Sequence, residues 1–157
     1  MALVVEDGSV VSGANSYVTL TEFKTWADNR GIDYGTDYVL EQKILRAMDF
    51  LERQPFIGEK ANEEQLLQWP RVEAVIDGYY VDATEVPTEV KKALYEATVV
   101  EIQGYSELNT QDRRTVMEKI GDITVQYASN SDNRTITPAL TFALSKIVNS
   151  AYLVSRT

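Results

Sequence analysis

The sequence predicts a mainly α-helical protein: a small helical bundle with short β-hairpins, a long central loop and a C-terminal helix. Three observations point to this fold class. Apolar residues recur at three- and four-residue steps in several segments, which is the helical period. Two short segments instead have turn residues between β-branched runs, as hairpins do. The chain has 157 residues and shows no internal repeat, so we expect one domain, residues 1–157, with its own core.

Four segments have the pattern of amphipathic helices. They span residues 20–30, 37–53, 87–103 and 138–155. Thr19 and Glu22 have the spacing of a capping box, which places the start of the first helix. Pro87 is expected at the first position of the third helix, where its missing N–H is tolerated. Thr137 and Pro138 suit the N-cap and first position of the last helix.

Hairpins are expected at residues 2–12 and 116–128. The first segment has β-branched runs on both sides of Asp7-Gly8, a pair that favours a tight turn. The second places Gly121-Asp122 before a run of alternating apolar and polar residues. Between the second and third helices, residues 55–86 form a long irregular stretch. A connection of this length usually has a function or carries short elements of its own.

Composition excludes several kinds of chemistry. The chain has no His and no Cys, so it lacks disulfides, thiolate catalysis, zinc–sulfur sites and the commonest general base. It contains no P-loop, no dinucleotide fingerprint and no nucleophile elbow. Pairs of carboxylates such as Glu63-Glu64 are expected by chance among 24 acidic residues. We therefore expect no enzyme activity, no catalytic residue, no cofactor and no metal site.

The charge of the chain is unevenly distributed. The formal net charge is −9, and residues 1–85 hold 16 acidic against 7 basic residues, whereas residues 122–157 hold 2 against 3. The longest basic clusters are the pairs Lys91-Lys92 and Arg113-Arg114, so tight general binding of DNA is not expected. No segment has the length of a membrane span or the pattern of a secretory signal, so we expect no membrane and a cytoplasm-like compartment.

The last predicted helix is the segment with the least charge. Lys146 is the single charged residue from 135 to 155. One apolar stripe contains Leu140, Leu144, Ile147 and Ala151, and Tyr152 widens it. Small hydroxylated residues on the opposite side allow packing against protein without burying charge. Two interpretations are equally open: a core helix of the monomer, or a helix partly buried against another chain.

The tripeptide Trp69-Pro70-Arg71 is the most specific feature of the central loop. Proline favours an extended conformation for the residue before it. The indole can then anchor in an apolar pocket, while Arg71 binds a carboxylate or backbone carbonyls. The motif either pins the long loop or belongs to an interface. Trp69 and Tyr79-Tyr80 also offer rings for base stacking. Because no basic residues are adjacent to them, we expect these rings to pack in a core or an interface instead.

Five segments occur in a distinctive order. They are ANSYVTLTEF, EQKILRAMDFLER, QWPR, DATEVPTEVKKALYEAT and EKIGDITVQYA. This ordered set resembles the head–tail adaptor (connector, head-completion) family of tailed bacteriophages, which is also labelled DnaT-like single-stranded DNA-binding. The resemblance covers about residues 14–128.

The resemblance implies a non-enzymatic subunit of a ring, usually of twelve copies. Such a ring sits in the virion neck, joins the portal protein to the next neck or tail protein and extends the DNA channel. Its subunits are made in the bacterial cytoplasm, and DNA passes through without specific binding. Related adaptors often dock a C-terminal segment onto the portal, which implies that residues 138–157 form a docking helix or tail. The alternative function is a single-stranded DNA-binding accessory protein, against which the charge of −9 argues.

Overall fold

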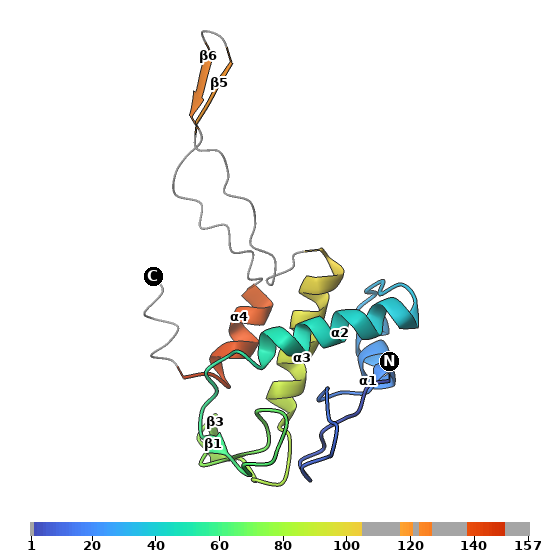
Figure 1. Cartoon of the computed structure of the whole chain (residues 1–157), viewed down its shortest axis with the longest axis vertical. Helices are drawn as coiled ribbons and strands as arrows, with labels where there is room; N and C mark the ends of the chain where they lie inside the picture. The colour runs from blue at the N-terminus through green and yellow to red at the C-terminus, as the bar shows by residue number, and fades with distance from the viewer. Residues whose placement is uncertain (1, 105–116, 121–122, 127–137, 150–157) are drawn as a thin grey trace.

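The computed structural model describes residues 2–104, 117–120, 123–126 and 138–149 (Figure 1). These residues contain four helices, namely α1 (Leu20–Asp28), α2 (Asp37–Leu51), α3 (Thr88–Ile102) and α4 (Pro138–Ser145). The strands are β1 (Glu59–Lys60), β2 (Arg71–Val72), β3 (Val75–Ile76), β4 (Tyr79–Tyr80), β5 (Met117–Ile120) and β6 (Ile123–Gln126). The predicted fold class, a small mainly α protein with short hairpins, is confirmed.

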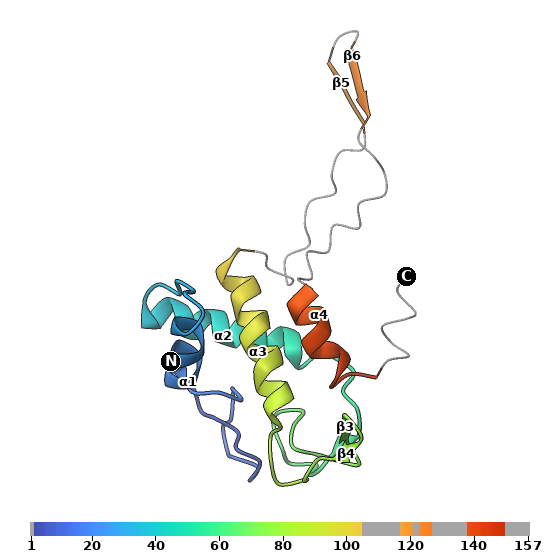
Figure 2. The same ribbon diagram turned by 180° about the vertical axis from the view of Figure 1, so that it is seen from behind.

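Helices α2, α3 and α4 form the core. Figures 1 and 2 show α3 against both α2 and α4, with α3 and α4 running in opposite directions. Most of the buried side chains of these helices are apolar, and they include Leu40, Ile44, Leu51, Val90, Leu94, Leu140 and Leu144. α3 also buries the polar side chains of Thr98 and Glu101. The apolar side chains stand at the helical spacing that the sequence indicates, so the periodic pattern identified the buried faces correctly.

The starts of the first three helices follow the predicted signals with one correction. Thr19 and Glu22 form a complete capping box: the Thr19 hydroxyl accepts from the Glu22 N–H at 3.0 Å, and the Glu22 carboxylate accepts from the Thr19 N–H at 2.6 Å. Thr36 caps α2 in a similar way. Pro87 is the N-cap of α3 and not its first helical residue, because its ψ of 152° is still extended.

Residues 2–12 are all described, and they do not form the predicted hairpin. Val5 instead pairs in parallel with Ser16, and Glu6 is 1% exposed. The Glu6 carboxylate accepts hydrogen bonds of 2.8 to 3.0 Å from three backbone N–H groups of the loop, those of Gly8, Val10 and Val11. The Glu6 carboxylate thus binds N–H groups in and after the predicted turn, so the segment forms a loop around Glu6 and not a hairpin.

The predicted helix over 138–155 is too long within the described residues. α4 ends at Ser145, and the chain then pairs with the start of the central loop. The Ile57 N–H donates to the Ile147 carbonyl at 3.0 Å, and the Asn149 N–H donates to the Pro55 carbonyl at 2.9 Å. The Ile147 carbonyl and the Asn149 N–H therefore bind residues of the central loop, and not residues of a further helical turn. Residues 150–155 lie outside the described part of the chain.

The central loop carries short elements, as its length indicates. β1 pairs with β2, and β3 pairs with β4, in both cases antiparallel. The β3–β4 hairpin turns through Asp77 and Gly78, whose φ values of 51° and 87° both lie in the left-handed region. This is the two-residue type I′ turn that an Asp-Gly pair favours. Sequence analysis expected such a turn at Asp7-Gly8 and did not identify this one.

The two strands of the hairpin expected over 116–128 are present and pair with each other. β5 pairs antiparallel with β6 from Met117↔Gln126 to Ile120↔Ile123. Its two turn residues, 121 and 122, lie outside the described residues. In the described part of the chain, no helix is both long enough and apolar enough to cross a membrane.

Candidate functional site

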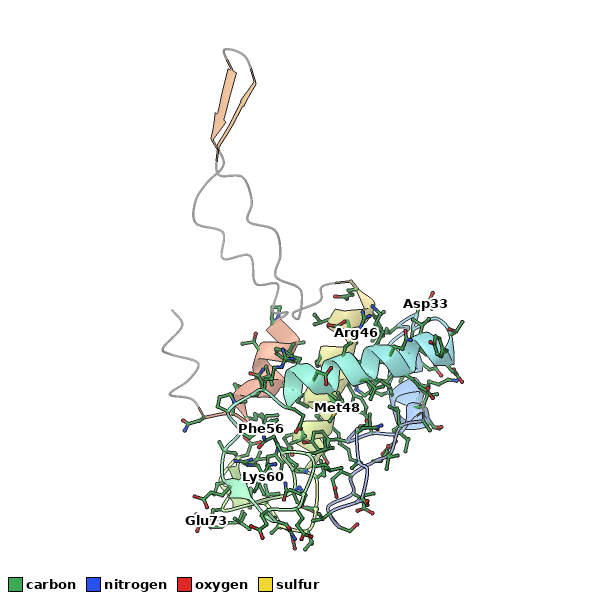
Figure 3. All side chains as sticks on the ribbon, viewed as in Figure 1. Asp33, Arg46, Met48, Phe56, Lys60 and Glu73 are labelled. Carbon is green, nitrogen blue, oxygen red and sulfur yellow. The ribbon has the colours of Figure 1, made fainter. Side chains whose placement is uncertain are left out.

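Three of the predicted interface residues, Trp69, Arg71 and Ile147, meet at one junction, where the central loop packs against the end of α4. Leu140 and Leu144 lie on the buried side of α4, and Leu140 faces α2 and α3 and not the loop. In Figure 3, Phe56 lies below the last turn of α4, and Lys60 and Glu73 mark the strand layer beyond it. We call this region the loop–α4 junction.

Arg71 binds backbone carbonyls, one of the two partners predicted for it. Its side chain is largely buried, and its Nε donates to the Ile57 carbonyl at 2.7 Å. Its Nη2 donates to the Gly58 carbonyl at 2.5 Å, and its Nη1 donates to the Gln68 side-chain oxygen at 2.9 Å. Burial lowers the pKa of Arg71. The guanidinium fork therefore holds residues 57–58 in place.

Trp69 is the predicted anchor of the loop. Its side chain is fully buried, and its ring meets that of Phe56 edge to face, with the centroids 5.9 Å apart. Phe56 in turn forms an antiparallel bridge with Val148, directly after α4. A fully buried indole has no free face, so Trp69 is excluded as a platform for stacking bases.

A buried polar network that sequence analysis missed supports the anchor. The Tyr17 hydroxyl accepts from the backbone N–H of Trp69 at 3.2 Å and donates to the Glu52 carboxylate. That carboxylate also accepts from the Gln68 N–H at 2.8 Å. Burial raises the pKa of Glu52, and burial together with the Glu52 charge raises the pKa of Tyr17. Tyr17 lies outside any helix or strand, so no periodic pattern indicated it.

Ile57 connects the two halves of the junction. Its carbonyl accepts from Arg71, and its N–H donates to the Ile147 carbonyl. Three residues predicted from separate patterns, Trp69, Arg71 and Ile147, are thereby brought into one hydrogen-bonded and packed unit. The junction fixes the direction in which the chain leaves α4.

The predicted apolar stripe of the last helix is buried inside this chain. Leu140 and Ile147 are 0% exposed, and Leu144 is 4% exposed. This burial matches the core interpretation for these three residues, and an interface role for them stays a prediction. Ala151 and Tyr152, the other two members of the predicted set, lie outside the described residues.

The solvent side of α4 has a different character. Its exposed residues carry no charge, and they are Pro138, Ala139, Thr141, Phe142 and Ser145. We call them the α4 outer face. Phe142 is 67% exposed, and the Lys146 ammonium lies 5.6 Å from the centre of its ring. A large exposed aromatic ring on an uncharged helix face is typical of a protein-binding surface.

Two further exposed aromatic residues lie on the β3–β4 hairpin. Tyr79 and Tyr80 are 78% and 83% exposed on β4. The Lys146 ammonium binds the Asp77 carboxylate at 2.7 Å, which ties the β3–β4 turn to the end of α4. Sequence analysis named these tyrosines but favoured burial in a core or interface; within this chain they are exposed.

The described residues offer no grouping for metal chemistry. Among them, no group of three or more Asp and Glu side chains is placed to hold a metal ion. Glu52 and Tyr17, two of the groups with raised pKa values, are buried and bonded to the loop. Their role is to hold the junction together.

The fold and the junction define a small, mainly helical protein with exposed aromatic groups suited to binding a macromolecule. A family model described as "Putative DnaT-like ssDNA binding protein" matches residues 1–156, and the chain belongs to this family. This confirms the family label that accompanied the resemblance, while the head–tail adaptor function is not part of the description. Comparisons with curated proteins and with solved structures find no match.

Proposed function

We propose that the chain is a structural subunit of a bacteriophage neck. It assembles into a ring, usually of twelve copies, and joins the portal protein to the next neck or tail protein. The observation that carries this proposal is the α4 outer face, an uncharged surface on a chain of net charge −9. The ordered segments that resemble head–tail adaptors support the same function.

The α4 outer face suits contact with another protein. Interface cores are depleted in charged residues and enriched in aromatic ones. Phe142 provides the aromatic ring, and the small neighbours Ala139 and Ser145 let a partner approach the helix closely. We assign this face, together with the segment after Asn149, to contact with the portal or with a neighbouring subunit.

The acidic remainder suits a DNA channel. Residues 1–104 hold 19 acidic and 9 basic residues. A wall with excess negative charge repels phosphate, so DNA slides past without being held. In this proposal the protein is no enzyme, needs no cofactor and acts in the virion after its synthesis in the bacterial cytoplasm.

The test is assembly with the portal protein from the same phage. The purified chain and portal are mixed and examined by size-exclusion chromatography and native mass spectrometry. We expect a complex that contains a closed ring of this chain. The absence of a complex, together with particles that lack the chain but still retain DNA and attach tails, contradicts the proposal.

A second candidate function is a single-stranded DNA-binding accessory protein. The description of the family favours it, and the exposed rings of Tyr79 and Tyr80 could stack on bases. Fluorescence anisotropy with a labelled oligothymidine tests it. Salt-dependent binding at micromolar or lower concentration supports this function, and the absence of binding at low salt removes it.

A further inference from the structure

We propose that the β5–β6 hairpin pairs edge to edge with the same hairpin of a neighbouring copy of this chain. The free edge of β6 in one copy meets the free edge of β5 in the next, so the sheet continues from copy to copy. The inference rests on the proposed function for the ring of copies. It assigns the backbone contact that joins them.

Both edges of the hairpin are open within the part of the chain that the structure describes. There, β5 and β6 form a separate two-stranded sheet, and no further strand or isolated bridge pairs with either. Figures 1 and 2 show the hairpin clear of the four helices. In an antiparallel pair, alternate residues direct their N–H and C=O groups away from the partner strand. Each strand therefore presents a row of backbone donors and acceptors on its outer edge.

Two strands of four residues are too small a sheet to be stable alone. An isolated two-stranded hairpin is at best marginally stable in water, and a third strand or a packed helix is needed to hold it. The sequence nevertheless favours strands here, with three β-branched residues from Ile123 to Val125. A strand from another chain supplies the missing contact through main-chain hydrogen bonds.

The place of the hairpin in the sequence lets it reach a neighbouring copy. Residues 105–116 and 127–137 separate the hairpin from the described ends of α3 and α4. The shorter of these segments, residues 127–137, has eleven residues. A chain of this length spans at most ~36–40 Å, more than the ~30 Å diameter of a small domain. Contact with the next copy is therefore within range.

Pairing between copies fits the charge and the symmetry of the strands. β5 contains Glu118 and Lys119, and β6 contains no charged residue, so the strands together are neutral in a chain of net charge −9. Copies therefore meet here without bringing like charges together. The strands have equal length, and every copy has one free edge of each kind. Repeating a β6-to-β5 contact around a ring pairs every edge.

The test is disulfide formation between single-cysteine variants of the full-length chain, which has no Cys of its own. Lys119→Cys is mixed before assembly with Thr124→Cys or, for a register shifted by two residues, with Gln126→Cys, and portal is added. Non-reducing electrophoresis measures the linked dimer. We expect one mixture to give at least about 10-fold more dimer than either variant alone, because pairing raises the effective concentration of the two thiols.

The variants on their own report the symmetry of the contact. In head-to-tail pairing, equivalent residues of neighbouring copies lie two strands apart, about 9 to 10 Å, which is beyond the reach of a disulfide. Strong linkage of Lys119→Cys alone would mean that β5 pairs with β5, and it overturns the inference.

Tyr38→Cys is the matched control, since Tyr38 is 66% exposed but lies on α2. Mixed with Thr124→Cys, it should give only the dimer that random collisions produce. Circular dichroism checks that each variant folds. Linkage at the control level in both hairpin mixtures overturns the inference. If the portal then protects the amides of residues 117–126 from hydrogen exchange, the hairpin binds the portal instead.

Native mass spectrometry of the same samples measures ring assembly, so the two proposals fail separately. Linked dimers from a chain that forms no ring with the portal overturn the adaptor function and leave the hairpin contact intact. A closed ring without linkage in either mixture overturns the hairpin contact alone.

Discussion

Tyr17 is the side chain that connects the N-terminal segment to the junction. It is fully buried, and its hydroxyl serves Trp69 as an acceptor and Glu52 as a donor. Unsatisfied polar groups in a buried site are costly, so this single hydroxyl stabilises both sides of the contact.

Tyr17→Phe should lower the free energy of unfolding by about 1 to 3 kcal/mol. The substitution keeps the ring but leaves the backbone N–H of Trp69 and one oxygen of Glu52 without their partner. Urea denaturation followed by circular dichroism measures the change. Tyr38→Phe, at an exposed position, should stay within about 0.5 kcal/mol of the wild type. Equal destabilisation by the two substitutions would contradict this account.

Alkaline pH should destabilise the protein through the same side chain. Burial raises the pKa of Tyr17 above its ordinary value of 10.0. Above pH 10 the unfolded chain loses this proton while the folded chain keeps it, so the free energy of unfolding falls, by up to about 1.4 kcal/mol per pH unit. The difference between wild type and Tyr17→Phe isolates the effect from the other titrating groups. Parallel stability curves between pH 9 and 11 would show that Tyr17 is not the cause.

The residue scale also shows what a sequence can reveal. Trp69 and Arg71 were identifiable because a Trp-Pro-Arg tripeptide carries its chemistry locally. Tyr17 and Glu52 are separated by 35 positions, and their bond exists only once the segment before α1 packs against the end of α2. No spacing within one segment indicates such a pair.

At the scale of elements, the approach of β2 to the loop before β1 depends on Gly58. Its φ is 72°, and a Cβ placed there would lie 2.4 Å from the Val72 carbonyl oxygen. This is shorter than any real Cβ contact, and the obstacle is backbone that cannot turn aside. Glycine is therefore required for two separate reasons, conformation and space.

Gly58→Ala should be clearly more destabilising than Gly35→Ala. Gly35 has the same φ of 72°, but a Cβ on this residue would meet no atom within 4 Å, so the control supplies the backbone strain without the collision. We expect roughly 1 kcal/mol for the control and at least about 2 kcal/mol more for Gly58→Ala. Thermal unfolding of the two variants measures the difference. Similar melting temperatures would show that the strands move apart freely.

Two Asp-Gly pairs illustrate why hairpins are harder to predict from the sequence than helices. Asp7-Gly8 and Asp77-Gly78 give the same local signal, but only the second forms a hairpin turn. Glu6 makes the difference, because its carboxylate binds the amides that follow the first pair. Helices α1, α2 and α3 were predicted nearly to their ends, since their caps and apolar faces are local features. The end of α4 was not, because residues 55–57 determine it.

At the scale of the whole molecule, the two sides of α4 have different roles in this account: the inner side stabilises the monomer, and the outer side contacts another protein. Its inner side chains complete the core, while its outer face remains in solvent. Leu144 is 4% exposed and Phe142 is 67% exposed, two residues apart on the same helix. Substitutions of these neighbours therefore distinguish a folding role from a binding role.

Phe142→Ser should leave the monomer folded and weaken assembly with the portal. Leu144→Ser should instead destabilise the monomer by about 2 to 5 kcal/mol, because it opens a cavity in the core. Urea denaturation measures the stability of the monomer, and native mass spectrometry of the mixture with the portal measures assembly. If Phe142→Ser assembles as well as the wild type, the α4 outer face is not the contact.

The most direct measurement of the central claim is a cryo-electron microscopy reconstruction of this chain bound to the portal protein of the same phage. The account predicts a closed ring seated on the portal, with the α4 outer face at a protein contact and an open channel along the axis. A chain that stays monomeric beside the portal, and that binds single-stranded DNA under the same conditions, would contradict it.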